Sequence, residues 1–151
     1  MKTDEQTTFT HLPQGLSPAV EPQTASIITT DSAGIVASET TIPSQGEQLP
    51  AYIARPANHD GPYPIVLVVQ EIFGVHQHIQ DVCRRLAKQG YMAIAPELYF
   101  RQGDPSHYND IQRILTELVH KVPDTQVLSD LDRAANWAIK QGGDASKLAI
   151  T

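Results

Sequence analysis

The chain has a single cysteine, Cys83, so no disulfide can form within it and no secretory disulfide framework is implied. No stretch approaches the ~20 apolar residues that a membrane-spanning helix needs, and the first residues lack the apolar core of a signal peptide. Basic residues are few and scattered, with 11 Lys and Arg against 17 Asp and Glu and a formal net charge of -6. A nucleic-acid-binding protein needs Lys and Arg clustered in a stripe that contacts the phosphates, and this sequence has no such cluster. The composition therefore predicts a cytoplasmic protein that binds neither nucleic acid nor a membrane.

Sites for a cofactor or a metal are also missing from the sequence. The glycines form neither G-x-G-x-x-G nor a Walker pattern, so no nucleotide cofactor is expected. His76 and His78 form an H-x-H pair, but no nearby cysteine or carboxylate set completes a metal site. They are expected to be loop residues. Cys83 lacks the Gly-x-Cys-x-Gly context of a nucleophile and reads as a small buried hydrophobe.

The length of 151 residues and the apolar content of 40% fit one globular domain with a sizeable core. Residues 1–26 are rich in Thr, Gln, Ser and Pro, and the spaced prolines prevent a helix or a strand from building up. We therefore expect an arm that packs little at 1–26 and a folded domain at 27–151.

Within that domain the pattern alternates between strands and helices. Two β-prone runs, 35–42 and 49–54, flank a turn cluster and predict an antiparallel hairpin at a sheet edge. Apolar runs at 65–69, 91–95 and 147–151 predict buried strands of a mainly parallel sheet. Helices between them are predicted from apolar residues at helical spacing: 79–86, ended by Gly90; 111–119, ended by Pro123; and 127–138, with Asp124 as N-cap and Gly142-Gly143 as stop. The class is α/β, with helices on both faces of the sheet.

One strand leads directly into polar chemistry. The run from Pro64 to Val69 is followed by Gln70-Glu-Ile-Phe-Gly-Val75, so the carboxylate of Glu71 falls at the carboxyl end of a predicted parallel strand. Open α/β sheets bind their ligands at this edge. We expect the Glu71 carboxylate to be partly desolvated there. The alternative is a structural carboxylate that caps the amides of the turn.

Together with Pro96-Glu-Leu-Tyr-Phe-Arg-Gln102, this segment resembles the N-terminal half of the dienelactone hydrolases, carboxymethylenebutenolidase-like members of the α/β-hydrolase fold. The resemblance covers roughly Ile35 to Thr151, although the family more often has Asp at the position of Glu97. After Thr151 the family continues into the Gly-x-Cys-x-Gly-Gly turn that carries its nucleophile, and its triad Asp and His come later still. The resemblance therefore implies a fragment that is inactive by itself.

The resemblance also implies roles for four residues in the hydrolysis of an ester or lactone by a Cys-His-Asp mechanism without a cofactor. Glu71 would contact the resting thiol and take part in its activation, and the backbone N–H of Ile72 would donate to the oxyanion. Arg101 would bind a carboxylate of the substrate, and Tyr99 would line the same pocket. From the residues alone, Arg101 could equally be a solvated surface side chain and Tyr99 a core residue.

Two other classes of protein remain open from the sequence. A non-catalytic α/β module could use the same edge to hold a small acidic ligand without breaking a bond. A receiver-like or flavodoxin-like domain fits less well, because no acidic cluster follows the first parallel strand and no phosphate loop is present.

Overall fold

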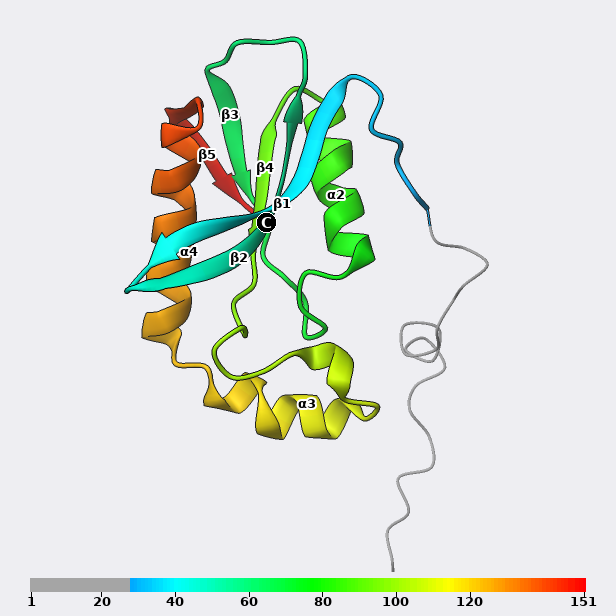
Figure 1. Ribbon diagram of the computed structural model, residues 1–151, viewed down its shortest axis with the longest axis vertical. Coiled ribbons are helices and arrows are strands. Elements are labelled where there is room, and N and C mark those ends of the chain that lie inside the picture. The colour runs from blue at the N-terminus through cyan, green and yellow to red at the C-terminus, as the bar shows by residue number, and fades with distance from the viewer. Residues whose placement is uncertain (1–27) are drawn as a thin grey trace, which may run out of the picture.

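The computed structural model describes residues 28–151, which form a five-stranded sheet flanked by helices (Figure 1). The arm predicted at 1–26 lies outside the described residues. The sheet order is β1-β2-β4-β3-β5. The elements, in chain order, are β1 (Ile35–Ser44), β2 (Glu47–Pro56), β3 (Tyr63–Leu67), α2 (Gln77–Lys88), β4 (Met92–Pro96), η1 (Pro105–His107), α3 (Ile111–Glu117), η2 (Val119–Lys121), α4 (Asp124–Lys140) and β5 (Gly143–Ile150).

The predicted N-terminal hairpin is confirmed. β1 and β2 pair antiparallel over their full length, from Ile35 opposite Pro56 to Ser44 opposite Glu47. Gln45 and Gly46 make the two-residue turn, with φ of 51° and 83°. Two successive left-handed residues give the turn whose twist matches that of the flanking strands. β2 also pairs antiparallel with β4, so the hairpin continues the sheet rather than standing apart from it.

The remaining strands form the parallel part of the sheet. β3 pairs parallel with β4 on one side and with β5 on the other, with Ile65 opposite both Met92 and Leu148. The last strand, β5, therefore lies directly beside the strand that leads to Glu71. α2 and α4 cover opposite faces of the sheet, while α3 lies beyond one end of it (Figure 1). The α/β class and the mixed sheet are those expected from the sequence.

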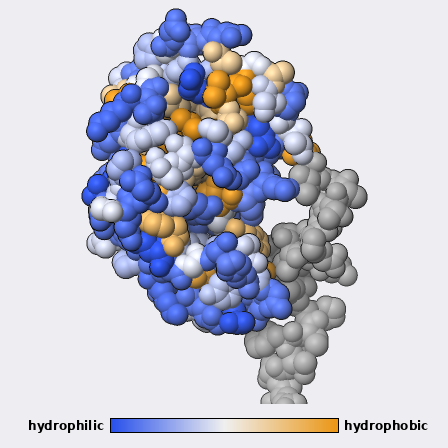
Figure 2. All heavy atoms as spheres, in the orientation of Figure 1, coloured by the Kyte–Doolittle hydropathy of each residue, from blue (hydrophilic) through white to orange (hydrophobic). Residues whose placement is uncertain are grey.

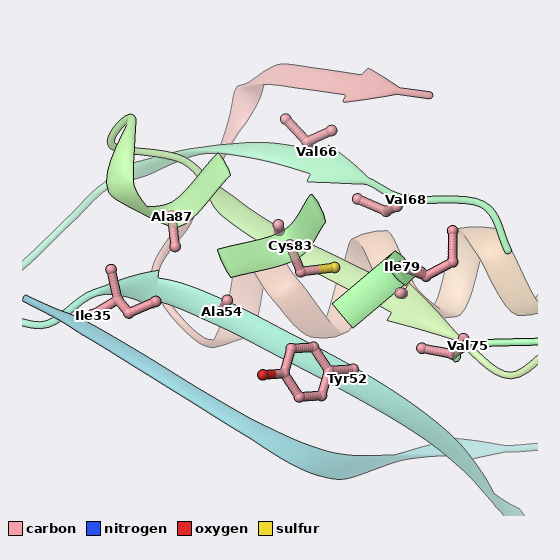
Figure 3. Packing of buried hydrophobic residues seen from close by; sticks show 11 residues of the cluster. Ile35, Tyr52, Ala54, Val66, Val68, Val75, Ile79, Cys83 and Ala87 are labelled. Atoms are coloured by element: carbon pink, nitrogen blue, oxygen red, sulfur yellow. The ribbon is translucent and has the colours of Figure 1, made fainter. Parts of the chain in front are cut away.

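Each face of the sheet carries its own apolar core. The face toward α2 includes Ala54, Val66 and Ile79, and Cys83 lies fully buried among them (Figure 3). Burial raises the pKa of the Cys83 thiol to about 12, which leaves almost no thiolate at neutral pH. Cys83 is therefore a packing residue, as its sequence context predicted. The opposite core, under α4, is formed by Ile42, Leu49, Ile65, Leu67, Met92, Ile94, Ala134 and Ala138 among others.

Three local predictions were wrong. The N-cap of α4 is Pro123, with ψ of 140°, and Asp124 is already the first helical residue. β5 begins at Gly143 rather than at 147, because the chain re-enters the sheet at once and Tyr63 N–H donates to the carbonyl of Gly142. His78 lies within α2 and not in a loop, and His76 is the N-cap residue of that helix.

Candidate active site

The candidate site is built on a tight turn that follows β3. Gly74 N–H donates to the carbonyl of Glu71 at 3.0 Å, which closes the turn from Glu71 to Gly74. Gly74 has a φ of +77°, a left-handed conformation that other residues rarely adopt, and a Cβ there would lie 3.2 Å from a carboxylate oxygen of Glu97. The glycine therefore allows both the bend and the close approach of a neighbouring strand.

The Glu71 carboxylate lies in this turn and is about half exposed. Its side chain is 57% exposed, and its Oε2 lies 3.3 Å from His76 Nε2. The turn follows the end of β3, and the desolvation of the carboxylate in the proposed full-length protein stays a prediction. The ring of His76 is itself in tilted contact with Phe73, at 6.0 Å between centroids, so the imidazole is oriented from within the same turn.

The backbone of Ile72 has a free donor. Gly74 N–H donates to the Glu71 carbonyl and Val75 N–H donates to Glu97, whereas Phe73 N–H, like that of Ile72, has no hydrogen bond in the described part of the chain. No hydrogen bond in the described part of the chain uses the N–H of Ile72. A backbone N–H held in a fixed turn at the carboxyl edge of the sheet is the kind of donor that an oxyanion hole needs.

Glu97 anchors this turn to the sheet, a contact that the sequence analysis missed. Its Oε1 accepts the Val75 N–H at 3.2 Å, and its own N–H donates to Pro50 on β2 at 2.8 Å. Burial raises the pKa of the Glu97 carboxyl, the Val75 hydrogen bond opposes this, and the charges of Asp104 and Glu39 add to it. The available signal was a carboxylate directly after the strand neighbouring β3.

Tyr99 lies next to the same motif through Gln70. The buried Gln70 side chain accepts the Leu98 N–H at 2.7 Å through Oε1, while its Nε2 has no hydrogen-bond partner among the described residues. Burial raises the pKa of the half-buried Tyr99 hydroxyl, and the nearby Gln70 side chain lowers it in part. Gln70, the residue that precedes Glu71, is thus bonded to the residue before Tyr99, and contact of Tyr99 with a substrate stays a prediction.

Arg101 lies elsewhere, in an ion-pair network between the hairpin and α4. Its Nη1 and Nη2 donate to Asp130 at 2.7 and 3.3 Å, its Nε donates to Glu47 at 2.5 Å, and Nη2 also donates to the Ser44 hydroxyl at 3.2 Å. Asp130 is fully buried, and the Arg101 side chain is 16% exposed. No hydrogen bond or ion pair among residues 28–151 joins the Arg101 side chain to the turn of Glu71. A role for Arg101 in binding a substrate carboxylate stays a prediction.

A cleft of about 570 Å³ opens between the hairpin and the turn. It is lined by Glu39, Thr40, Thr41, Pro50, Ala51, Tyr52, Val75, Gln80 and Glu97. In the orientation of Figure 1, hydrophilic residues dominate the surface and the apolar ones form separate patches (Figure 2).

Residues 28–151 contain no group of three or more His, Cys, Asp or Glu arranged to hold a metal ion. No helix in this part of the chain is long and apolar enough to cross a membrane.

The fold and the turn define a domain of the α/β-hydrolase type: a mixed sheet with parallel core strands, helices on both faces, and a polar turn with a free amide at the carboxyl edge. Residues 49–151 match the model of the dienelactone hydrolase family, and this chain belongs to that family.

Similar proteins point the same way. A Yersinia pestis protein named "Putative carboxymethylenebutenolidase" is 70% identical over 118 residues, which cover 78% of this chain and 44% of that protein. An Escherichia coli K12 protein of the same name is 59% identical over 137 residues, 91% of this chain and 51% of that protein. The crystal structure titled "Putative Dienelactone Hydrolase" from Klebsiella pneumoniae is 69% identical, with a TM-score of 0.75 over 77% of this chain and 48% of that one. The chain thus spans about half the length of the relatives it matches.

Proposed function

We propose that this chain is the N-terminal half of a hydrolase that cleaves ester or lactone bonds. The observation that carries the proposal is the turn after β3, where the unpaired Ile72 N–H and the Glu71 carboxylate stand side by side at the carboxyl edge of the sheet. Family membership and the names of the relatives support the reaction class. A cytoplasmic location is proposed with it, from the single, buried cysteine.

In the proposed reaction a thiolate from the part that the relatives have beyond this segment attacks the acyl carbonyl. A C–S bond forms and the C–O bond to the leaving alkoxide breaks, with a histidine from that same part returning the proton to the alkoxide. Water then hydrolyses the thioester and regenerates the thiol. The Ile72 N–H donates to the negative oxygen of each tetrahedral intermediate.

Glu71 is proposed to control the protonation of the thiol. A carboxylate at a turn next to the oxyanion donor can accept the thiol proton or hold the thiol in its resting position. Its exposure among residues 28–151 leaves it accessible to a group that approaches the edge of the sheet. Tyr99 is proposed to line the substrate pocket, since it follows Leu98, whose N–H is bonded to the residue before Glu71.

The rival proposal is a non-catalytic α/β module that holds a small acidic ligand. Turnover by the full-length protein decides between the two, with p-nitrophenyl acetate and a neutral γ-lactone as substrates. A hydrolase should turn over at least one of them, lose that activity in Glu71→Ala, and keep it in Cys83→Ala, because Cys83 is buried away from the edge. Absence of turnover of both substrates, or equal activity in Glu71→Ala, would contradict the hydrolase proposal.

A further inference from the structure

Residues 28–33 precede β1 and run beside α2 (Figure 1). Apart from local bonds at the end next to β1, every hydrogen bond of this segment within the described chain goes to a side chain of α2. Thr30 N–H donates to Asp81 Oδ1 at 2.5 Å, and the Thr30 carbonyl accepts a bond from Arg84 Nε at 3.0 Å. Both backbone groups of one residue are therefore bound by two side chains that lie one helical turn apart.

A second attachment lies one turn further along the helix. Lys88 Nζ is 2.6 Å from Asp31 Oδ1, and it also donates to the Ala33 carbonyl at 3.3 Å. Asp81, Arg84 and Lys88 occupy positions i, i+3 and i+7 of α2, and residues at this spacing share one face of a helix. That face of α2 is thus a binding site for a length of backbone, and the segment before β1 fills it.

Asp81 is the anchor of this binding site. The residue is 1% exposed, and its carboxylate also pairs with Arg85 at 2.6 Å and with Arg84 at 3.4 Å. Burial would raise the pKa of Asp81, but the hydrogen bonds from Thr30 and Arg85 outweigh it and hold the pKa below its ordinary value. A buried carboxylate is stable only while its donors are in place. Loss of the segment would therefore remove one of the donors that stabilise Asp81.

The same contacts lead to the candidate site. Arg84 donates through Nη1 to the Tyr52 hydroxyl at 3.0 Å, and Tyr52 lines the cleft beside the turn of Glu71. α2 itself begins at Gln77, shortly after that turn. The segment is thus connected to one wall of the cleft through Arg84, and to the element that follows the turn through α2.

The bonds that hold the segment on α2 are polar and open to water. All residues from 28 to 33 except Thr30 are exposed. Ile28, the one large apolar side chain among them, is 67% exposed, so apolar packing contributes little. Salt weakens exposed charge pairs such as Asp31 with Lys88, and segments with few buried contacts open more readily than a core does.

We propose that residues 28–33 form a detachable strap, and that its attachment to Asp81, Arg84 and Lys88 fixes α2 and holds Tyr52 in the wall of the cleft. The attached strap supplies a donor to Asp81 and an acceptor to Arg84. The detached strap leaves both side chains short of a partner and α2 less well held. The inference concerns contacts within residues 28–151 and does not depend on the proposed hydrolysis.

The test compares two truncations of the full-length protein by hydrogen exchange and mass spectrometry. One begins at residue 28 and keeps the strap, and the other begins at residue 34 and lacks it. In the shorter protein we expect the amides of 77–88 in α2 and 47–56 in β2 to exchange about tenfold faster or more, while 124–140 in α4 is unchanged. The protein that begins at residue 28 should match the wild type.

A pair of single substitutions tests the same contact without a truncation. Thr30→Pro removes the N–H that Asp81 accepts, so it should speed exchange in α2. Thr29→Pro is the matched control, because no hydrogen bond within residues 28–151 uses the Thr29 N–H. Raising potassium chloride from about 0.05 M to about 0.5 M should also speed exchange in α2 of the wild type, and should have no such effect on the protein that begins at residue 34.

Equal exchange of α2 in the two truncations would overturn the inference, and so would an equal rise in α4, because the whole fold would then be destabilised. If the protein that begins at residue 34 does not fold, the two proline variants decide: equal exchange of α2 in Thr30→Pro and Thr29→Pro overturns the inference as well. Exchange in α2 of the wild type that does not respond to salt would show that the strap is not detachable.

Discussion

Removal of the Asp130 carboxylate should destabilise the protein far more than removal of Glu47, the other carboxylate that pairs with Arg101. Asp130 is fully buried and accepts three hydrogen bonds, two from Arg101 and one from Ser44. Asp130→Ala would leave a largely buried guanidinium with Glu47 as its remaining charged partner. Breaking a buried ion pair by removing one member costs about 3–5 kcal/mol, because the other charge stays buried without compensation.

The lower end of that range applies here. Arg101 keeps Glu47 and is 16% exposed, so water can reach part of the guanidinium. We therefore expect about 3 kcal/mol for Asp130→Ala. Glu47→Ala removes a pair whose carboxylate is half exposed, and such pairs contribute about 0–1 kcal/mol. Asp132→Ala, at an exposed position on the same helix, should stay within about 0.5 kcal/mol of the wild type.

Urea unfolding of the full-length variants measures these differences, with Trp137 fluorescence and circular dichroism as independent probes. A loss of about 3 kcal/mol is a large part of the 5–15 kcal/mol that a typical domain has. The reasoning fails if Asp130→Ala costs less than about 1 kcal/mol, or if Glu47→Ala costs as much, since either result would mean that water already stabilises the guanidinium.

Three further predictions concern the turn and the sheet edge. Glu71→Ala should lower kcat by about 100-fold or more in the full-length protein while changing the melting temperature little, and equal losses of activity and folded protein would contradict a chemical role. Burial raises the pKa of Glu97, so its contribution to stability is present at low pH and is lost as the pH rises through the folded pKa. Glu97→Gln, which can still accept the Val75 N–H, should therefore melt higher than the wild type at alkaline pH and lose this advantage in acid; a pH-independent difference would refute it. The 151-residue chain itself should bind ANS and associate, because Leu148 and Ile150 on β5 are 48% and 59% exposed. A chain that elutes as a monomer in size-exclusion chromatography and melts cooperatively in a thermal scan would refute this prediction.

The fold was predictable because its signals are local. The hairpin follows from Gly46 between two β-prone runs, and the parallel strands follow from apolar runs of strand length that end in turn residues. The position of Glu71 follows equally from the strand before it. The element ends were predicted less well, as β5 shows, because pairing with β3 decides where that strand begins.

The contacts of Arg101 could not be predicted because they depend on how distant elements cross. Ser44 and Asp130 are 86 residues apart in the chain, and they meet only because α4 packs over the end of the hairpin. One signal was present: Asp130 lies between Val127 and Ala134 at helical spacing, on the apolar face of its helix. A carboxylate there needs a partner, and the sequence does not say which cation supplies it.

The turn of Glu71 and the Glu71 carboxylate are determined by different parts of the protein. Within residues 28–151, the Gly74 N–H closes the turn by donating to the Glu71 carbonyl. Glu97, after the end of β4, accepts the Val75 N–H and donates its own N–H to Pro50 on β2. The Ile72 N–H is therefore in a fixed position before any substrate arrives, which is what electrostatic stabilisation of an oxyanion requires. The carboxylate, by contrast, is held only by His76 from within this segment and remains mostly exposed. We therefore propose that its chemical behaviour is set by the groups that approach it at the sheet edge, and we expect Glu71→Ala and a substitution of the proposed thiol to combine non-additively, because the two groups would act in contact.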